Sequence, residues 1–505
     1  RANAAGIDRE PHDFDGFQAY AQYLRKIVAT PANLDLIKQA SQKGMRLMFD
    51  TVGGCMHQNM VPLLKTLQMP EIFDWHNSSE DPFFHGVGKT RKINPKTGLE
   101  GFFDLSCDVS LPEVSRTMGY EIFLKDKPVG YTALITDPDG DRLLIGQVEP
   151  AKAAEKLASL GIDYLKIDDE KIVSIYHPAF TFLLVMDFQM RQLQAAGLWK
   201  DHPRFIVTTT PSPRSWDEWA AKNNIKVINT PVGIKEIATV MKKAEGKIKS
   251  NPNQEVVVDD VWGNQINLGI QPRMVFGGEE SGGMIMGPEE LVKSKNERLA
   301  MAMRDKSAGE ASVIATALAS WLFLQGKPIS QHLEDIFNEY DIKYRYYLRA
   351  DITYYNESEP DPIKLKESKI AGEKLRDEID SFCLGLIFAL KDGLINLAQA
   401  RDILHESMPD LDFSELQDIR FTGDATYFAF KNMFVQIRRS GTDAKLRGYA
   451  NGDDKNKCEK FLDKMVHYSG ELTPLYKKFI SSEFLGEVYV RQEKLYKTYL
   501  YKDLM

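Results

Sequence analysis

Three aspartates at alternating positions mark the first stretch of this 505-residue chain that could do chemistry. Asp137, Asp139 and Asp141 lie between an apolar run that ends at Thr136 and a second run from Leu143 to Ile145. Such runs on either side of Pro and Gly predict a strand, a tight loop and a second strand. Crowded carboxylates repel one another unless a cation lies among them, and Mg²⁺ prefers oxygen ligands of this kind. The residues alone leave two interpretations open, a magnesium-binding loop and a solvated turn.

Two later loops carry polar groups of complementary kinds. Gly278–Gly283 presents Glu279, Glu280 and Ser281 between glycines, and carboxylates and hydroxyls can hydrogen-bond to sugar hydroxyls. Arg438–Tyr449 combines arginines, which bind phosphate oxygens in pairs, with hydroxyls and backbone N–H groups. Each loop also has a simpler interpretation. The first could be a flexible acidic surface loop, and the second could be a basic turn on a solvated face.

Composition narrows the class of protein. The net charge of −8 argues against a general nucleic-acid binder. No apolar run is long enough to span a bilayer, and the most apolar one, Ala311–Leu324, predicts a buried helix. The chain starts at Arg1 rather than Met, so we expect a fragment or a processed product. A reduced, cytoplasmic setting fits the cysteines, which show neither metal-like nor disulfide-like spacing: Cys55, Cys107, Cys383 and Cys458.

Hydrophobic patterns predict α/β units in tandem, followed by a part in which strands and helices are mixed. A strand-turn-helix pattern starts at Met45, a second opens at His177, and an aromatic, strand-like stretch begins near Lys343. Residues 75–104 are polar and predict an inserted loop. The predicted parts are a helical remnant of a first domain (1–44), a second domain (45–176), a third domain (177–343) and a fourth domain with a C-terminal extension (344–505).

These loops, in this order, resemble the α-D-phosphohexomutase family, which includes phosphoglucomutases and phosphomannomutases. Asp137 to Arg142 resembles the metal loop of that family, and Gly278 to Gly282 resembles its sugar-recognition loop. Thr230, Gly233 and Lys235 resemble its Thr-x-x-Gly-x-Lys segment. Its phosphate-binding loop matches a longer set: Arg438, Ser440, Gly441, Thr442, Lys445, Arg447 and Tyr449.

The resemblance implies a four-domain protein, in which tandem, related mixed α/β domains are followed by a smaller α+β domain. It also implies a Mg²⁺-dependent transfer of phosphate between positions 1 and 6 of a hexose. A phosphoserine and a hexose 1,6-bisphosphate intermediate would carry the group. The three aspartates would hold the metal beside Arg142, and Lys306 would be the basic residue near the transferring group. Glu279 and Ser281 would hold sugar hydroxyls. The remaining matched residues would bind substrate (Thr230, Gly233 and Lys235) or grip the phosphate that is not reacting (Arg438, Ser440, Gly441, Thr442, Lys445 and Arg447).

Two departures from the family pattern stand out. The phosphoserine loop, typically Thr-Ala-Ser-His-Asn-Pro, is absent, and the closest string, His57 to Met60, has no serine. We therefore expect most of the first domain, with its phosphoserine, to lie outside this chain. Ser307 and Ala308 stand where the family usually has Asp-Gly. The long spacing from Gly283 to Lys306 predicts an inserted helix.

The leading hypothesis is a phosphohexomutase, an isomerase of carbohydrate metabolism. Phosphoglucomutase is favoured because the Glu-Glu-Ser form of the sugar loop is commoner in glucose-preferring members. A phosphomannomutase, a mutase for pentose or amino-sugar phosphates, and a non-catalytic sugar-phosphate-binding relative are the alternatives. We expect a small-molecule sugar phosphate as partner, no nucleic acid or membrane, and a monomer or homodimer. The fragment alone is predicted to be inactive as a mutase.

Overall fold

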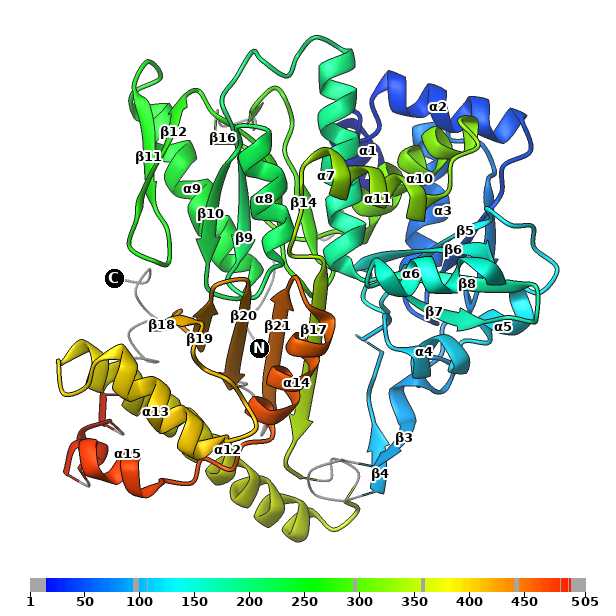
Figure 1. The fold of residues 1–505 in the computed structure, drawn as a ribbon. Coiled ribbons are helices and arrows are strands. Elements are labelled where there is room, and N and C mark those ends of the chain that lie inside the picture. Colours follow the sequence, from blue (N-terminus) through cyan, green and yellow to red (C-terminus); the bar gives the residue numbers. More distant parts are fainter. Residues whose placement is uncertain are drawn as a thin grey trace, which may run out of the picture.

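A computed structural model places mixed helices and sheets in the arrangement shown in Figure 1. It describes residues 15–93, 100–106, 108–293, 298–355, 359–439, 445–481, 483–488 and 490–491. The sheets have six, four and five strands, with three further two-stranded hairpins among the described residues. The predicted α/β fold class is confirmed. No helix in the described ranges combines the length and apolar character that crossing a bilayer requires.

The six-stranded sheet positions the acidic loop. Its strand order is β2-β1-β5-β6-β8-β7, and β1, β2 and β5 run parallel. The acidic loop follows β5 and precedes β6, so the predicted strand, loop and strand are confirmed. Its strands are β1 (Leu47–Asp50), β2 (Phe73–His76), β5 (Thr132–Thr136), β6 (Leu143–Pro150), β7 (Asp163–Lys166) and β8 (Lys171–Tyr176).

The segment predicted as an inserted loop at 75–104 contains more regular structure than expected. It holds the end of β2, the 3₁₀ helix η1 (Phe84–Lys89), and a hairpin of β3 (Thr90–Ile93) and β4 (Glu100–Phe103) that projects from the sheet (Figure 1). The prediction of an inserted loop was wrong for β3 and β4. It relied on the polar composition of the segment, whereas these strands pair through backbone hydrogen bonds. Short helices follow as α4 (Pro112–Thr117), α5 (Tyr120–Phe123), η2 (Ala151–Ala153) and α6 (Ala154–Ser159).

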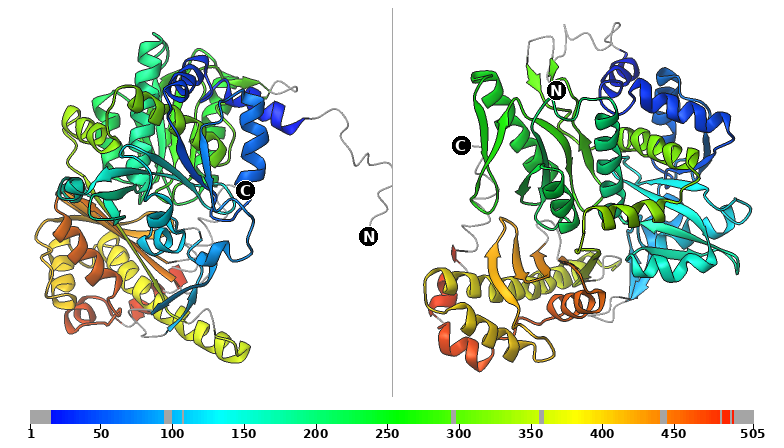
Figure 2. Two further views of the ribbon diagram at one scale, coloured as in Figure 1. Left: turned by 90° about the vertical axis from the view of Figure 1, so that its right-hand side faces the viewer. Right: turned by 45° about the horizontal axis from the view of Figure 1, so that its top comes forward.

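The N-terminal helices pack into the main core. Helix α1 (Gly16–Leu24) starts after Asp15, whose carboxylate accepts the Gln18 N–H, and α2 (Pro31–Gln42) follows. Helix α10 (Ala308–Leu324) lies against α2, as the right-hand view of Figure 2 shows. Residues 308–320 of α10 are all buried, which confirms the predicted buried helix.

A four-stranded sheet with the order β10-β9-β13-β14 carries the second polar loop. That loop lies at the carboxyl end of β13, which is parallel to β9 and β10. The strands are β9 (Arg204–Thr209), β10 (Lys226–Thr230), β13 (Arg273–Gly278) and β14 (Met284–Met286). The surrounding helices are α7 (Pro178–Ala195), α8 (Arg214–Lys222), α9 (Ile234–Ser250) and α11 (Ile329–Glu339).

The inserted helix expected between Gly283 and Lys306 is wrong for the residues that the structure describes there. They form β14 and the hairpin of β15 (Val292–Lys293) with β16 (Leu299–Ala300). A separate hairpin, earlier in the chain, pairs β11 (Glu255–Asp259) with β12 (Gln265–Ile270). Pairing with β13 buries Met284–Met286 completely, and Pro288 then interrupts any helical pattern.

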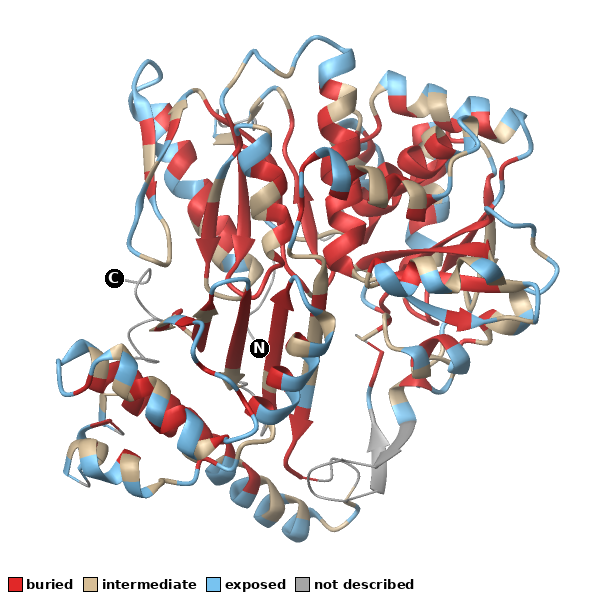
Figure 3. Ribbon diagram, viewed as in Figure 1, coloured by how far each residue is buried: buried red, intermediate tan, exposed pale blue. Residues whose placement is uncertain are grey.

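The C-terminal part is an antiparallel sheet, β17-β21-β20-β19-β18, with helices beside it. Buried residues form a main core from Ala21 to Ile342 and a second core from Ile352 to Val488 (Figure 3). The strands are β17 (Tyr346–Thr353), β18 (Leu416–Phe421), β19 (Ala425–Phe430), β20 (Met433–Arg439) and β21 (Lys445–Gly452). The helices are α12 (Pro362–Lys391), α13 (Leu397–Ser407), α14 (Lys455–Val466) and α15 (Pro474–Phe479).

Candidate functional site

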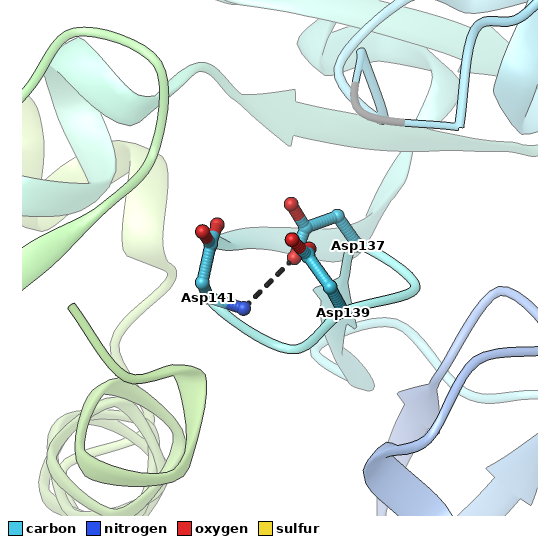
Figure 4. A group of neighbouring side chains, drawn as sticks. All are labelled: Asp137, Asp139 and Asp141. Atoms are coloured by element: carbon cyan, nitrogen blue, oxygen red, sulfur yellow. Dashed lines mark hydrogen bonds between the residues drawn. The ribbon is translucent and has the colours of Figure 1, made fainter. Parts of the chain in front are cut away.

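The acidic loop brings its three aspartates together. One carboxylate oxygen from each of Asp137, Asp139 and Asp141 lies within 4.8 Å of the others (Figure 4). Asp137 is fully buried, Asp141 is half-buried and Asp139 is exposed. Oδ1 of Asp137 accepts the backbone N–H groups of Asp141 and Arg142, both at 3.0 Å. These bonds wrap the loop around the Asp137 side chain and fix its direction.

Close backbone contacts hold the loop between two helix N-termini. A Cβ at Gly54 would lie 2.0 Å from the carbonyl oxygen of Pro138, so only glycine fits there. That same carbonyl accepts the Cys55 N–H at 2.9 Å, just before helix α3 (Met56–Leu67). On the other side, the Gly140 carbonyl accepts the Ala308 N–H at 2.9 Å, where α10 begins. The left-handed φ of +72° at Gly140 makes the turn between these contacts possible.

The protein's own donors leave the acidic charge of the loop incompletely balanced. Oδ2 of Asp137 is buried without a hydrogen-bond partner, and Nε of Arg142 lies 3.3 Å from it. Burial, followed by the charges of Asp141 and Asp139, raises the pKa of Asp137 to about 8. A hard divalent cation would supply the missing positive charge, and carboxylate oxygens are suitable ligands. The residues present therefore fit a magnesium ion.

Lys306 links the acidic loop to the loop after β13. Its Nζ lies 2.8 Å from Oδ2 of Asp141 and 3.8 Å from Oε2 of Glu279. A Cβ at Gly283 would meet Cδ of Lys306 at 2.4 Å, so glycine leaves room for the lysine stem. Burial, and then the charge of Glu280, raise the pKa of Glu279 to about 7. Glu279 can therefore either accept or donate a hydrogen bond near neutral pH.

The two loops are also joined through their backbones. Arg142 and Gly283 form an isolated antiparallel bridge, and the Leu143 N–H donates to the Gly282 carbonyl at 3.1 Å. A small cavity at this junction is lined by Arg142, Glu280, Ser281 and Arg349, among others. Predicted residues from three distant segments, Asp137–Arg142, Glu279–Ser281 and Lys306, thus converge at one place.

The described members of the predicted phosphate-binding set, Arg438, Lys445 and Arg447, lie on the C-terminal sheet. Arg438 on β20 is opposite Arg447 on β21, and Arg447 is opposite Asp351 on β17. Nε of Arg438 donates to Oδ2 of Asp424 at 2.5 Å. Lys445 lines a cavity of about 410 Å³ between β17 and residues 104–112. Ser440, Gly441 and Thr442 lie outside the described residues.

Thr230, Gly233 and Lys235 lie at the end of β10 and the start of α9. None of the hydrogen bonds or ion pairs found in the described ranges joins them to the acidic loop. The intervening Val232 N–H donates to Asp424, the partner of Arg438, so this segment adjoins the C-terminal sheet instead. Lys235 is exposed in the first turn of α9.

The sequence analysis missed Arg349 on β17. Its Nη1 donates to Oδ1 of Asp108 at 3.0 Å, and its Nε donates to Oδ1 of Asp351 at 3.0 Å. Arg349 lines both the small cavity beside Arg142 and the larger one beside Lys445. The strand alternation puts Arg349 and Asp351 on one face, but only the pairing with β21 places that face beside Arg447.

The fold and the site define a mixed α/β protein in which a metal-ready acidic loop, a carboxylate loop and a lysine converge. Residues 184–340 match the family described as "Phosphoglucomutase/phosphomannomutase, alpha/beta/alpha domain III", and this part of the chain belongs to that family. The predicted resemblance to phosphohexomutases is thereby shown for that domain, which covers less than half of the chain. It contains the carboxylate loop and Lys306, whereas the acidic loop lies outside it. No curated protein matches the sequence.

Three solved structures are similar to this chain at low sequence identity. One is a phosphoglucomutase/phosphomannomutase family protein from Burkholderia thailandensis (12% identity, TM-score 0.46, covering 89% of this chain and 63% of that one). A second is the open form of the phosphoglucomutase parafusin from Paramecium (15%, 0.47, 90% and 63%). A third is the N-acetylphosphoglucosamine mutase of Aspergillus fumigatus in complex with GlcNAc-6P and magnesium (12%, 0.42, 89% and 65%). The chain spans less than two thirds of the length of these proteins.

Proposed function

We propose that this chain forms the metal- and substrate-binding part of a phosphohexomutase, with phosphoglucomutase as the preferred activity. One observation carries the proposal: Lys306 bridges Asp141 and Glu279, so a cation-binding loop and a sugar-binding loop share one lysine. Phosphoryl transfer depends mainly on positioning and charge neutralisation, and this junction supplies both kinds of group. The proposal includes Mg²⁺ as cofactor and a hexose 1,6-bisphosphate as intermediate.

Each residue has a role that its surroundings permit. Asp137, Asp139 and Asp141 would hold Mg²⁺, which would neutralise charge on a transferring phosphoryl group. Lys306 and Arg142 add fixed positive charge at the same place, and Lys306 can also exchange a proton with a sugar oxygen. Glu279 and Ser281 hydrogen-bond to sugar hydroxyls.

The C-terminal sheet supplies a second anion site in this proposal. Arg438 and Arg447 are neighbours across two strands and would hold the phosphate that is not reacting. Each already has a carboxylate nearby, Asp424 for Arg438 and Asp351 for Arg447. A bound phosphate would compete with those carboxylates, which makes binding weaker than for two unpaired arginines.

Calorimetric titration and a coupled mutase assay test the proposal together. We expect glucose 1,6-bisphosphate to bind in the presence of Mg²⁺, and the Glu279→Gln and Arg438→Ala variants to weaken that binding. Asp169→Ala serves as a control because Asp169 is 96% exposed in a turn remote from the site. Conversion of glucose 1-phosphate, compared with mannose and pentose phosphates, assigns the preferred sugar. No binding of any of these phosphates would refute the proposal.

A second function is favoured by one observation in the sequence. No Thr-Ala-Ser-His-Asn-Pro string occurs in these 505 residues, so no matching phosphoserine segment accompanies the site. The alternative is a non-catalytic protein that binds sugar phosphates. Tight, Mg²⁺-dependent binding without any turnover, in a protein that includes whatever sequence precedes Arg1, would favour this alternative over the mutase.

A further inference from the structure

Helix α1 contacts the segment that carries Lys306 through two tyrosine hydroxyls. The Tyr20 hydroxyl lies 2.6 Å from Oγ of Ser307, and the Met303 N–H donates to the Tyr23 hydroxyl at 2.8 Å. Tyr20 and Tyr23 are three positions apart on one helix, so both side chains face the same way. The two hydroxyls contact the segment Met303–Ser307 at its two ends, and Lys306 lies between these contacts.

Ser307 transmits the Tyr20 contact to the lysine. It is the N-cap residue of α10, and its Oγ accepts the Glu310 N–H at 3.4 Å. A cap residue sets the direction in which the chain enters its helix. Lys306 immediately precedes this cap, so the position of Ser307 fixes the backbone from which the lysine side chain extends. The absence of a Cβ at Gly283 leaves the space that the lysine stem occupies.

Glu310 connects the same tyrosines to the carboxylate loop. Its side chain is 2% exposed, its Oε1 accepts the Met286 N–H at 2.5 Å, and it shares a hydrogen bond with the Tyr23 hydroxyl. Met286 belongs to β14, which directly follows the loop of Glu279. Burial raises the pKa of Glu310 to about 8, which suits a buried carboxyl with no cationic partner. Tyr23 and Glu310 therefore tie the lysine segment to the strand beside the sugar-binding loop.

We infer that Tyr20 and Tyr23 are positioning residues that hold Nζ of Lys306 between Asp141 and Glu279. The inference rests on the proposed function for the role of Lys306, but the geometry it describes can be measured without any substrate. The inference assigns α1 a role in positioning a site residue. The sequence pattern alone places Tyr20 only on a buried helix face. The competing explanation is that the hydroxyls merely anchor α1 to the core.

Removal of single hydroxyls separates these explanations. Tyr20→Phe and Ser307→Ala each delete one side of the same contact while the aromatic ring and the helix remain. Acetylation of Lys306 by an N-hydroxysuccinimide ester, followed at one fixed pH by peptide mass spectrometry, reports how firmly its amine is held. We expect roughly threefold faster labelling in both variants, because an ion pair of this kind protects its amine only modestly. Lys222 on α8 provides an internal reference.

Three comparisons make the result specific. The double variant should label no faster than Ser307→Ala, because the bond between Tyr20 and Ser307 is already lost there together with the cap bond to the Glu310 N–H. Ser307→Thr keeps a hydroxyl at this position and should restore the wild-type rate. Tyr476→Phe is the matched control: its hydroxyl donates to the Phe382 carbonyl at 3.2 Å in the second core, so its loss lowers stability without reaching Lys306. Unchanged Lys306 labelling in Tyr20→Phe, together with a lowered melting temperature, would overturn the inference.

A functional readout then distinguishes this inference from the proposed function. In mutase assays of a protein that also carries a phosphoserine segment, Tyr20→Phe should lower kcat about tenfold and leave KM within about twofold, because a misplaced group costs rate more than binding. If the wild-type protein shows neither turnover nor sugar-phosphate binding, the proposed function fails, while the labelling result still decides whether α1 positions Lys306. If kcat and labelling are both unchanged, the positioning role itself is refuted.

Discussion

Asp74 on β2 and Asp137, in the loop after β5 of the same six-stranded sheet, have carboxylates with opposite pKa shifts. Asp74 on β2 accepts hydrogen bonds from Arg46 at 2.6 Å, Tyr131 at 2.7 Å and Lys127 at 2.9 Å. Burial alone would raise its pKa, but the bonds from Lys127, Arg46 and Tyr131 outweigh that effect and lower the pKa to about 2. Asp137 has two backbone amides on one oxygen, no hydrogen bond on the other, and a pKa raised to about 8.

The hydrogen bonds of Asp74 are those of a structural carboxylate, whereas the unpartnered oxygen of Asp137 is typical of a carboxylate that binds a ligand. The protein supplies two cations and a hydroxyl to Asp74, so nothing further is needed there. Around Asp137 it supplies two more carboxylates, which oppose ionisation, and the Arg142 guanidinium 3.3 Å away offsets burial and these charges only in part. Such an arrangement costs stability unless an external cation binds, so the imbalance at Asp137 is itself evidence for a metal site.

The largest effect should come from the exposed member of the acidic loop. Asp139→Ala removes one oxygen ligand while leaving the two more deeply packed aspartates in place. We expect Mg²⁺ affinity to fall by at least about 100-fold, because ligand number and charge set affinity at such sites. Isothermal titration with MgCl₂ measures the change, and Asp169→Ala is the control. Equal Mg²⁺ affinity in Asp139→Ala and the wild type would contradict a metal site in the acidic loop.

Asp74→Asn should produce the next largest effect, on stability. The substitution keeps the shape of the side chain but weakens charge-assisted hydrogen bonds to Arg46 and Lys127. We expect the free energy of unfolding to fall by about 1–3 kcal/mol, as for other hydrogen bonds to charged groups. Urea denaturation without Mg²⁺ provides the measurement. A neutral result would mean that the contacts of Asp74 are too solvent-screened to matter.

Asp137→Asn should behave in the opposite way in the absence of Mg²⁺. The Asn side-chain oxygen can still accept the N–H groups of Asp141 and Arg142, and the carboxyl it replaces, with a pKa of about 8, is already mostly uncharged at neutral pH. We expect the free energy of unfolding to stay constant or to rise by up to about 1 kcal/mol. The wild type, but not Asp137→Asn, should gain about 2.7 kcal/mol when Mg²⁺ is present at 100 times its Kd. Clear destabilisation of the metal-free variant would contradict the comparison.

The last prediction concerns the pH dependence of stability at Asp74. Its folded-state pKa of about 2 lies below the unfolded value of about 3.9. A depressed carboxyl pKa contributes stability above the unfolded value and loses it as the pH falls through the folded value. The stability difference between the wild type and Asp74→Asn should therefore shrink between about pH 4 and pH 2. A difference that stays constant over this range would show that charge plays no part at Asp74.

Local patterns in the sequence were sufficient for several elements. The apolar runs around the acidic loop predicted β5 and β6, and the apolar stretch after Ser307 predicted α10. Both depend on interactions between near neighbours and on total burial. The segment between Gly283 and Lys306 failed because β14 is stabilised by pairing with β13 rather than by its own periodicity.

Other parts of the site depend on contacts that no local pattern encodes. Tyr20 meets Ser307 across 287 positions, and Arg349 meets Asp108 across 241. The predicted roles of the individual site residues, and the domain limits near residues 44, 176 and 343, remain predictions. The geometry adds proximity. Lys306 reaches Asp141 and Glu279, whereas the segment that contains Lys235 adjoins the C-terminal sheet through Val232.

One short stretch of chain after Ile342 is the covalent link between the main core and the second core, which also meet in contacts such as the Arg214 N–H bonded to Asn451. Glu218 accepts the N–H groups of Lys343 and Tyr344 there, at 2.9 and 3.1 Å. Because this link keeps Asp137–Arg142 and Arg438 in one molecule, a ligand that has bound to one of them meets the other at an effective concentration set by the length and stiffness of the link. A ligand that contacts both Asp137–Arg142 and Arg438 would therefore gain affinity from a piece of chain that it never touches.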